Sequence, residues 1–147
     1  MRIREFKSEL WLPLLPPELF EFFGDASNLD ALTPPWLHFH IVTPLPIHMQ
    51  AGALIDYRLR LHGVPIRWRT RINVWEPPHR FIDEQIHGPY QRWIHEHTFV
   101  EHDGGTLARD VVSYAVPLDF MSHRFLVRPE IEKIFAFRSQ ELLKRFK

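Results

Sequence analysis

The chain has no cysteine, only 6 glycines and no net charge, since 18 basic side chains balance 18 acidic ones. Without cysteine there are no disulfides and no thiol nucleophile, which is typical of proteins from a reducing compartment. No run of basic residues provides the positive surface on which nucleic-acid binding depends. We therefore expect a protein without disulfides, thiol catalysis or a nucleic-acid partner.

Long apolar runs are also absent. No stretch of apolar residues is long enough to cross a bilayer, and no charged start precedes one as in a signal peptide. The one pair of adjacent glycines, Gly104-Gly105, lies between two predicted strands and not where a strand meets a helix, which excludes a phosphate-binding loop there. We expect a cytoplasmic protein with no membrane span.

What the chain does have is apolar and aromatic side chains. Of its 147 residues, 45% are hydrophobic and 14% are aromatic, a composition typical of a folded globular protein. We expect one domain over residues 1–147, which is large enough to bury roughly two-thirds of its unfolded surface.

Prolines and changes in hydrophobic period divide the chain into elements. Residues 3–12 alternate as a strand, Pro17 suits the first turn of a helix that Gly24 ends, and Asp25 can cap a second short helix reaching Leu32. A period of two then predicts strands at 36–42, 54–62, 66–75 and 80–87, and two more in 91–117. From Pro129 a helical spacing of apolar residues follows: Ile131, Ile134, Phe135, Leu142 and Phe146.

Frequent turn signals with no helices between the later strands predict an antiparallel meander. The fold class is therefore α+β, with the order strand, two short helices, six strands and a long C-terminal helix. The alternating arginines of 67–71 are expected to form a solvated ladder. Trp75 falls on the outward face of its strand and is a candidate interface residue, and Glu141 is spaced to pair with Arg145.

The most informative segment is the hairpin 91–117. Asp103-Gly104 is a strong signal for a two-residue turn, which places His97 opposite Asp110 and Trp93 opposite Tyr114. Cross-strand partners point to the same face. That face carries Trp93, His95, His97, Phe99, Ala108, Asp110, Val112 and Tyr114. Such a face is too polar for an ordinary core and too aromatic for a solvent face, and it indicates the wall of a cavity.

Several motifs together point to a known family. They are Leu32-Thr33-Pro34-Pro35-Trp36-Leu37, Phe81…Asp83…Gln85…Gly88-Pro89, Trp93…His95…His97…Phe99, Gly104-Gly105-Thr106 with Asp110 and Tyr114, and Ile134-Phe135…Arg138. Over essentially the whole chain, the pattern resembles the START-like / polyketide cyclase-dehydrase (SRPBCC) helix-grip superfamily, in its bacterial ligand-binding branch.

The resemblance implies a curved antiparallel sheet of about seven strands wrapped around the long C-terminal helix. Between sheet and helix it implies a cavity for a small molecule. The superfamily includes polyketide cyclases, birch-pollen-type plant proteins and coenzyme-Q-binding proteins. It therefore specifies a fold more closely than an activity.

The polar part of the hairpin face allows three interpretations. His95 and His97 could share a metal, with Asp110 as third ligand or as the group that orients them. His97 and Asp110 could instead act as an acid/base pair, with Tyr57 or Tyr114 donating to a substrate oxygen. In the third interpretation these groups satisfy one another's hydrogen bonds in a pocket wall, the common state of buried polar groups. We favour the third, and expect no metal and no cofactor.

We therefore predict a cavity that binds a hydrophobic or amphipathic small molecule, such as a lipid, a quinone, an aromatic or a polyketide-like compound. The expected contacts are Tyr57, Trp68, Phe81, Asp83, Gln85, Trp93, His95, His97, Phe99, Asp110 and Tyr114. Two alternatives stay open. One is a cyclase/dehydratase-type enzyme that uses His97 and Asp110, and the other is a module that regulates a partner protein without a ligand. Both a monomer and a homodimer are compatible with the sequence.

Overall fold

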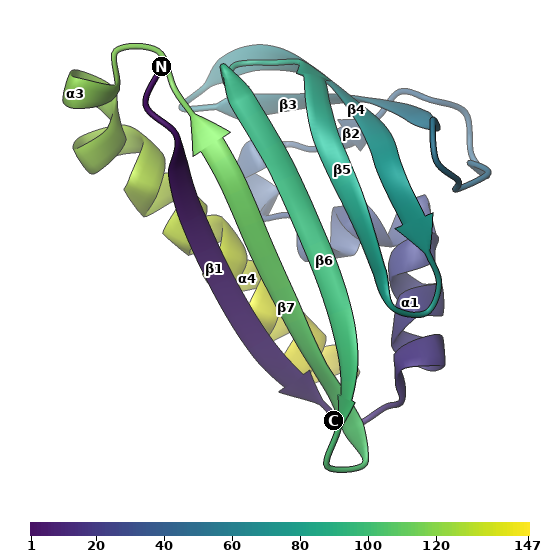
Figure 1. Cartoon of the computed structure of the whole chain (residues 1–147). Helices are drawn as coiled ribbons and strands as arrows, with labels where there is room; N and C mark the ends of the chain where they lie inside the picture. The colour runs from purple at the N-terminus through teal and green to yellow at the C-terminus, as the bar shows by residue number, and fades with distance from the viewer.

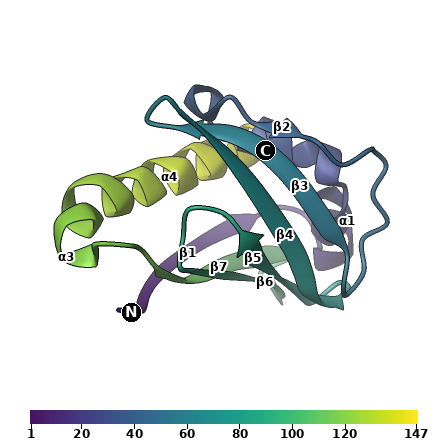
Figure 2. The same cartoon turned by 90° about the horizontal axis from the view of Figure 1, so that it is seen from above.

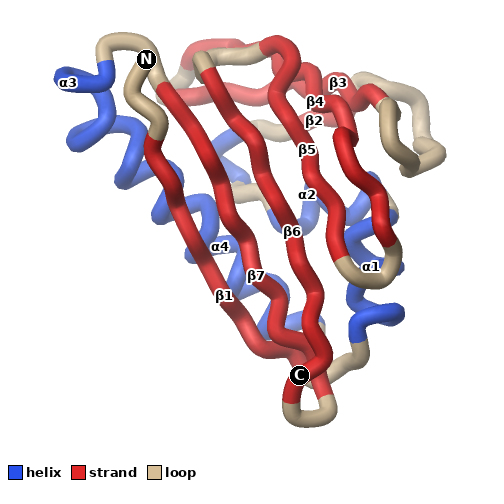
Figure 3. Tube along the Cα trace, in the orientation of Figure 1, coloured by secondary structure: helices blue, strands red, loops and turns tan.

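The computed structural model describes residues 1–147, and its central feature is a seven-stranded antiparallel sheet that curves around a long C-terminal helix (Figures 1 and 2). The strands lie in the order β1-β7-β6-β5-β4-β3-β2. All the helices lie on one side of the sheet (Figure 3). This arrangement confirms the predicted α+β helix-grip fold.

The element bounds follow the predicted order closely. The strands are β1 (Arg4–Leu12), β2 (His40–Ile41), β3 (Leu54–Leu61), β4 (Val64–Glu76), β5 (Arg80–His87), β6 (Arg92–His102) and β7 (Gly105–Ala115). The helices are α1 (Pro16–Gly24), η1 (Ala26–Asn28), α2 (Leu29–Leu32), η2 (Pro35–Leu37), α3 (Asp119–Ser122), the π-helical turn η3 (His123–Val127) and α4 (Arg128–Arg145). None of the helices has both the length and the apolar composition needed to span a bilayer.

The predicted register of the β6–β7 hairpin is confirmed. His97 pairs with Asp110, Trp93 pairs with Tyr114, and the turn closes between β6 and β7. Both turn residues have positive φ, 48° at Asp103 and 74° at Gly104, as the tight turn that matches strand twist requires. The polar and aromatic residues of the hairpin therefore share one face, as the sequence predicts.

The predicted strand at 36–42 is largely wrong. Pro34 and Pro35 lead into the short helix η2, and His38 then takes a left-handed conformation with φ of 47°. Only His40–Ile41 pair with β3, as β2. Alternation of side chains in this stretch reflects a turn that packs Leu37 inward, and not a pleated strand.

The predicted outward position of Trp75 is also wrong. The pairing of β4 with β5 shifts between Ile72 and Val74, and a bulge of this kind reverses which face the following residues occupy. Trp75 therefore packs inside, against Phe20 at 4.9 Å and Phe81 at 5.3 Å between ring centroids.

The C-terminal helix is continuous with α3 and η3 and buries the predicted stripe through Ile131, Phe135 and Leu142. Its predicted Glu141–Arg145 pair is wrong. Glu141 instead accepts from Lys144 at 3.3 Å, and the Arg145 guanidinium lies 5.2 Å from the centre of the Phe22 ring. The three arginines of 67–71 are exposed as expected, and two of them pair with Asp56 and Glu84.

The interior has two unlike halves. At one end α1 packs its aromatic side chains onto the sheet and forms a solid core with Leu12, Phe81 and Phe99. Toward the other end Ile131 and Phe135 of α4 pack on Val112 and Tyr114 of β7, and a cavity lies between α4 and strands β3 to β6.

Candidate ligand-binding site

A half-open cavity of about 210 Å³ lies between the concave face of the sheet and α4. It is lined by 25 residues, of which 19 are hydrophobic. The inward faces of β3 to β6 form one wall, the short helices before β2 form another, and Ile131, Ile134 and Phe135 of α4 close the third. The sheet supplies this lining because alternate residues of each strand point to its concave face.

Aromatic side chains from β3, β4, β6 and the β5–β6 connection line one part of the cavity. Trp68, Tyr90 and Trp93 contact one another with ring centroids 4.8 to 5.7 Å apart. Tyr57 lies against Phe39 at 5.1 Å. The Trp68 indole donates to the Thr70 hydroxyl at 3.0 Å, so its polar atom is satisfied within the wall. These contacts hold large rings against the sheet and keep the cavity from collapsing.

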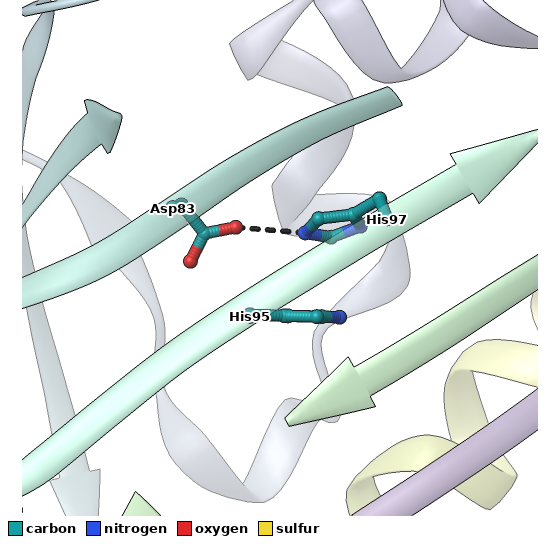
Figure 4. A group of neighbouring side chains, drawn as sticks. All are labelled: Asp83, His95 and His97. Atoms are coloured by element: carbon teal, nitrogen blue, oxygen red, sulfur yellow. Dashed lines mark hydrogen bonds and ion pairs between the residues drawn. The ribbon is translucent and has the colours of Figure 1, made fainter. Parts of the chain in front are cut away.

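At its deeper end the cavity reaches two buried histidines and a carboxylate (Figure 4). His97 Nε2 is hydrogen-bonded to Asp83 Oδ2 at 2.7 Å, and His95 Nε2 is hydrogen-bonded to Asp110 Oδ1 at 2.7 Å. His97 Nδ1 lies 3.3 Å from the same Asp110 oxygen. Arg138 of α4 donates to that oxygen at 3.4 Å. Five charged or titratable side chains thus form one network.

The two imidazoles are stacked, and so is the ring beside them. Phe81 lies 3.9 Å from His97 with 14° between the ring planes, and His97 lies 3.6 Å from His95 with 24° between the planes. The stack arises because His95 and His97 are alternate residues of β6 while Phe81 is the β5 partner of His97. Stacking fixes the direction in which each ring nitrogen points.

The carboxylates of the network are held in the ionised form. Burial opposes this, but a hydrogen bond from His97 and the nearby charges of His95, His97 and Arg138 lower the pKa of Asp83. The pKa of Asp110 lies well below its ordinary value, since burial is outweighed by the charge of Arg138 and by hydrogen bonds from both histidines.

Their surroundings shift the pKa values of the two histidines in opposite directions. Burial lowers the pKa of His95, and the neighbouring charge of His97 lowers it further, more than its hydrogen bond to Asp110 compensates. For His97, burial is outweighed by hydrogen bonds to Asp110 and Asp83, so its pKa is raised. His97 is therefore protonated more readily than His95.

With His97 protonated and His95 neutral, the charges of the network balance. Asp83 and Asp110 face the Arg138 guanidinium and the His97 imidazolium. His97 Nε2 is directed at Asp83, and its Nδ1 lies 3.3 Å from Asp110 and 3.4 Å from an Arg138 nitrogen. His95 Nδ1 has no hydrogen-bond partner in the chain and is not fully buried. If Nε2 of neutral His95 donates to Asp110, its Nδ1 is a free acceptor. In that tautomer the cavity, which His95 lines, meets an imidazole nitrogen that has no partner in the chain.

The same residues do not form a ready metal site. Ligand atoms of Asp83, His95 and His97 lie within 4.8 Å of one another, so the carboxylate nearest to a shared metal would be Asp83 and not the predicted Asp110. Zinc, however, lies in the plane of each imidazole at about 2.0–2.1 Å from nitrogen. Rings stacked 3.6 Å apart and tilted by only 24° do not direct their lone pairs to one point. The arrangement suits a hydrogen-bonded network better.

Of the eleven residues predicted to contact a ligand, seven line the cavity: Tyr57, Trp68, Phe81, Asp83, Trp93, His95 and His97. Four do not. Asp110 lies behind the histidines, and Phe99 belongs to the solid core. Gln85 bonds to the main chain of Tyr90 and holds the β5–β6 turn, and Tyr114 is hydrogen-bonded to His123 at 2.7 Å.

The list of predicted contacts missed Arg138. This arginine lines the cavity and is only 14% exposed, and its guanidinium also lies 5.1 Å from the centre of the Phe23 ring. The signal was present, because Arg138 falls at helical spacing within the apolar stripe formed by Ile131, Phe135 and Leu142. A charge on a buried stripe marks a residue that must have a partner inside.

Comparison with known proteins agrees with this geometry. The family model described as "Polyketide cyclase / dehydrase and lipid transport" matches residues 12–139. No curated protein matches the chain in sequence.

Solved structures share the fold at low sequence identity. A protein from Chromobacterium violaceum aligns with a TM-score of 0.75 at 13% identity, over 97% of this chain and 97% of its own. The Zhui aromatase/cyclase from a Streptomyces species aligns with a TM-score of 0.73 at 13% identity, over 98% and 93%. The ginseng major latex-like protein 151 from Panax ginseng aligns with a TM-score of 0.71 at 7% identity, over 98% and 97%.

Proposed function

Because this chain belongs to the polyketide cyclase / dehydrase and lipid transport family, we propose that it binds an apolar or amphipathic small molecule between its sheet and α4. In this proposal residues 1–147 act as a single ligand-binding domain. The observation that carries it is the largely apolar cavity that ends on a buried histidine pair. A concave, mostly apolar site with a few converging polar groups is the usual form of a small-molecule site.

The size of the cavity supports a ligand with at least one ring. An apolar cavity of about 150 Å³ binds benzene, and the cavity here measures about 210 Å³. Its aromatic wall of Trp68, Tyr90 and Trp93 offers flat surfaces for stacked or edge contacts, each worth roughly 0.5–1.5 kcal/mol beyond the burial of area. The half-open shape leaves room for a chain that extends beyond the ring.

The charge of the network selects the polar end of the ligand. The carboxylates are already balanced by Arg138 and His97, so a charged ligand group would be desolvated without a partner. In the tautomer that donates from Nε2 to Asp110, His95 Nδ1 is an acceptor. We infer that the ligand carries a neutral hydrogen-bond donor, such as an alcohol, phenol or enol, at the end that reaches His95.

Binding can be tested with the neutral fluorescent dye N-phenylnaphthylamine and by native mass spectrometry of gently purified protein. We expect saturable dye fluorescence and a retained apolar compound. Leu59→Trp places a larger side chain in the cavity and should weaken dye binding at least tenfold. Leu143→Trp is the matched control, because Leu143 is 48% exposed and lies outside the cavity. Equal dye binding by both variants would refute the proposal.

A second candidate function is acid–base catalysis, and one observation favours it. His95 lines the cavity, is oriented by Asp110 through Nε2, and has no hydrogen-bond partner in the chain at Nδ1. A carboxylate that holds an imidazole in this way is a common arrangement for proton transfer. Its lowered pKa keeps His95 neutral and able to accept a proton. The fold is shared with an aromatase/cyclase, which makes enolisation of a ketone the reaction to test.

Acetophenone in deuterated water provides that test. His95 Nδ1 would take a proton from the methyl carbon, the enolate would form, and a deuteron would return to the same carbon. We expect deuterium incorporation, followed by NMR, to fall to the solution rate in His95→Gln. A pH profile of the exchange should decline as the pH falls through the pKa of His95. Exchange at the solution rate with the wild-type protein would leave binding as the only function.

A further inference from the structure

His95 is the member of the stacked histidine pair whose surroundings are mostly apolar. Apart from its bond to Asp110 at 2.7 Å and the stacked His97 ring at 3.6 Å, its neighbours are the rings of Phe135 at 5.6 Å and Trp93 at 6.4 Å. His95 is only 5% exposed, and it lines the cavity. A charge on this ring can therefore be hydrated only from the cavity.

Charged groups face His95 from every strand and helix that packs around it. They are Asp83 on β5, His97 on β6, Asp110 on β7 and Arg138 on α4. The cavity tyrosines, Tyr57 and Tyr90, stay neutral because burial raises the pKa of each. Two carboxylates balance two cations when His97 is protonated and His95 is neutral. A proton on His95 would therefore leave this buried network with a net positive charge.

The geometry sets the order in which the two rings take up protons. His97 has Asp83 at 2.7 Å and Asp110 at 3.3 Å, and its pKa is raised above 6.5. A second proton would place like charges on rings only 3.6 Å apart, and burial together with the charge of His97 lowers the pKa of His95 below 6.5. Both carboxylates stay ionised above 3.8. Below 6.5 and above 3.8, His95 is thus the group of the network that changes its charge.

We propose that protonation of His95 releases the ligand, so that the site binds apolar compounds near neutral pH and lets them go in mild acid. An apolar ligand displaces water from the cavity, and a charged His95 beside it would lie in surroundings that do not solvate the charge. The ligand therefore binds better to the protein with a neutral His95. Because such coupling is reciprocal, a bound ligand also makes His95 harder to protonate. The proposal rests on the proposed binding function and adds its regulation.

The affinity for N-phenylnaphthylamine, which stays neutral in this range, is measured between about pH 8 and about pH 5. We expect the wild-type dissociation constant to rise as the pH falls below 6.5, toward about tenfold for each pH unit. His95→Gln, which has no imidazole to protonate, should lack this rise. The matched control is His102→Gln, because His102 is an exposed histidine at the end of the same strand. Its profile should follow that of the wild type.

Proton NMR of the imidazole rings provides the reciprocal measurement. The ring resonances of His95 are assigned from their loss in His95→Gln. They should titrate at a lower pH when the protein is saturated with the dye, whereas those of His102 should titrate at the same pH with and without it. Circular dichroism at each pH shows whether the protein stays folded.

Four results would overturn the proposal: a wild-type dissociation constant that does not rise below 6.5, an equal rise in His95→Gln, a rise that coincides with loss of the circular dichroism signal, or a titration of His95 that the dye leaves unchanged. These results are distinct from failure of the binding function. Dye binding near neutral pH that Leu59→Trp weakens upholds that function even without a pH dependence. Absence of dye binding at every pH would refute both.

Discussion

Phe99 and His97 are two residues apart on β6 and point to the same face of the sheet, yet they lie in different surroundings. Phe99 is packed against Phe20 and Phe23 of α1 at 5.3 to 5.4 Å. His97 faces a cavity and is held by Asp83 and by a stacked ring on either side. The strand is the same, so the difference comes from what covers it.

This difference shows how one curved sheet provides both stability and a site. Where α1 covers the sheet, aromatic rings interdigitate and water is excluded. Around the cavity between β3 to β6 and α4, the side chains are tied to one another by stacking and hydrogen bonds. Side chains of the cavity wall have no neighbouring atoms on the side of the empty space, so they contribute less packing energy than side chains of the core.

Truncating one aromatic side chain in each region should give the largest difference in stability between the core and the cavity wall. Phe99→Ala leaves a hole in a close-packed region and should lower the free energy of unfolding by roughly 3–5 kcal/mol. Trp68→Ala removes a larger ring, but that ring is half-buried and faces the cavity on one side, so we expect roughly half that loss. Urea unfolding monitored by circular dichroism measures both. Equal losses would contradict the division into core and cavity.

Enlarging one side chain in each region should give a difference in the same direction, with smaller effects. Ala108→Leu forces extra volume into the solid core and should cost about 1–3 kcal/mol of unfolding free energy. Leu59→Phe adds its volume to the cavity and should change stability by less than about 1 kcal/mol. Urea midpoints of the two variants give the comparison. A larger loss for Leu59→Phe would mean that the cavity does not persist in solution.

Acid should affect the cavity end more than the core end, and this is the smallest of the three effects. The lowered pKa values of Asp83 and Asp110 give stability that is present above their ordinary value of 3.8 and is lost as the pH falls below it. His95, with a lowered pKa, adds stability above 6.5 that is lost as the pH falls. His97, with a raised pKa, adds stability below 6.5 that is lost as the pH rises through its folded value.

Asp110→Asn isolates the carboxylate contribution. In the wild type, Asp110 stays ionised in the folded protein and takes up a proton on unfolding, so the free energy of unfolding falls as the pH drops below 3.8. Asp110→Asn removes this proton uptake, so its free energy of unfolding should fall less steeply. Asp30→Asn is a matched control on the surface and should follow the wild-type profile. Urea unfolding at a series of pH values provides the data. A steeper profile for Asp110→Asn would show that Asp110 is protonated in the folded state.

Much of the site could be predicted because it lies on one hairpin. The turn Asp103-Gly104 sets the register, and the register places His95, His97 and Asp110 on one face. The hydrogen-bond partners within that face could not be predicted. The prediction paired His97 with Asp110, whereas the shortest contact of His97 is with Asp83 on β5 and that of Asp110 is with His95. The β5–β6 pairing depends on sheet curvature, which no local pattern specifies.

The sequence by itself determined the α+β class, the order of the elements and the faces of the regular strands, because periodicity and turn chemistry are local properties. The tertiary structure decided the rest. A bulge in β4 turned Trp75 inward, α1 filled one end of the sheet, and α4 brought Arg138 to Asp110. These outcomes depend on how distant segments pack, since burial and charge pairing arise only when those segments meet in space.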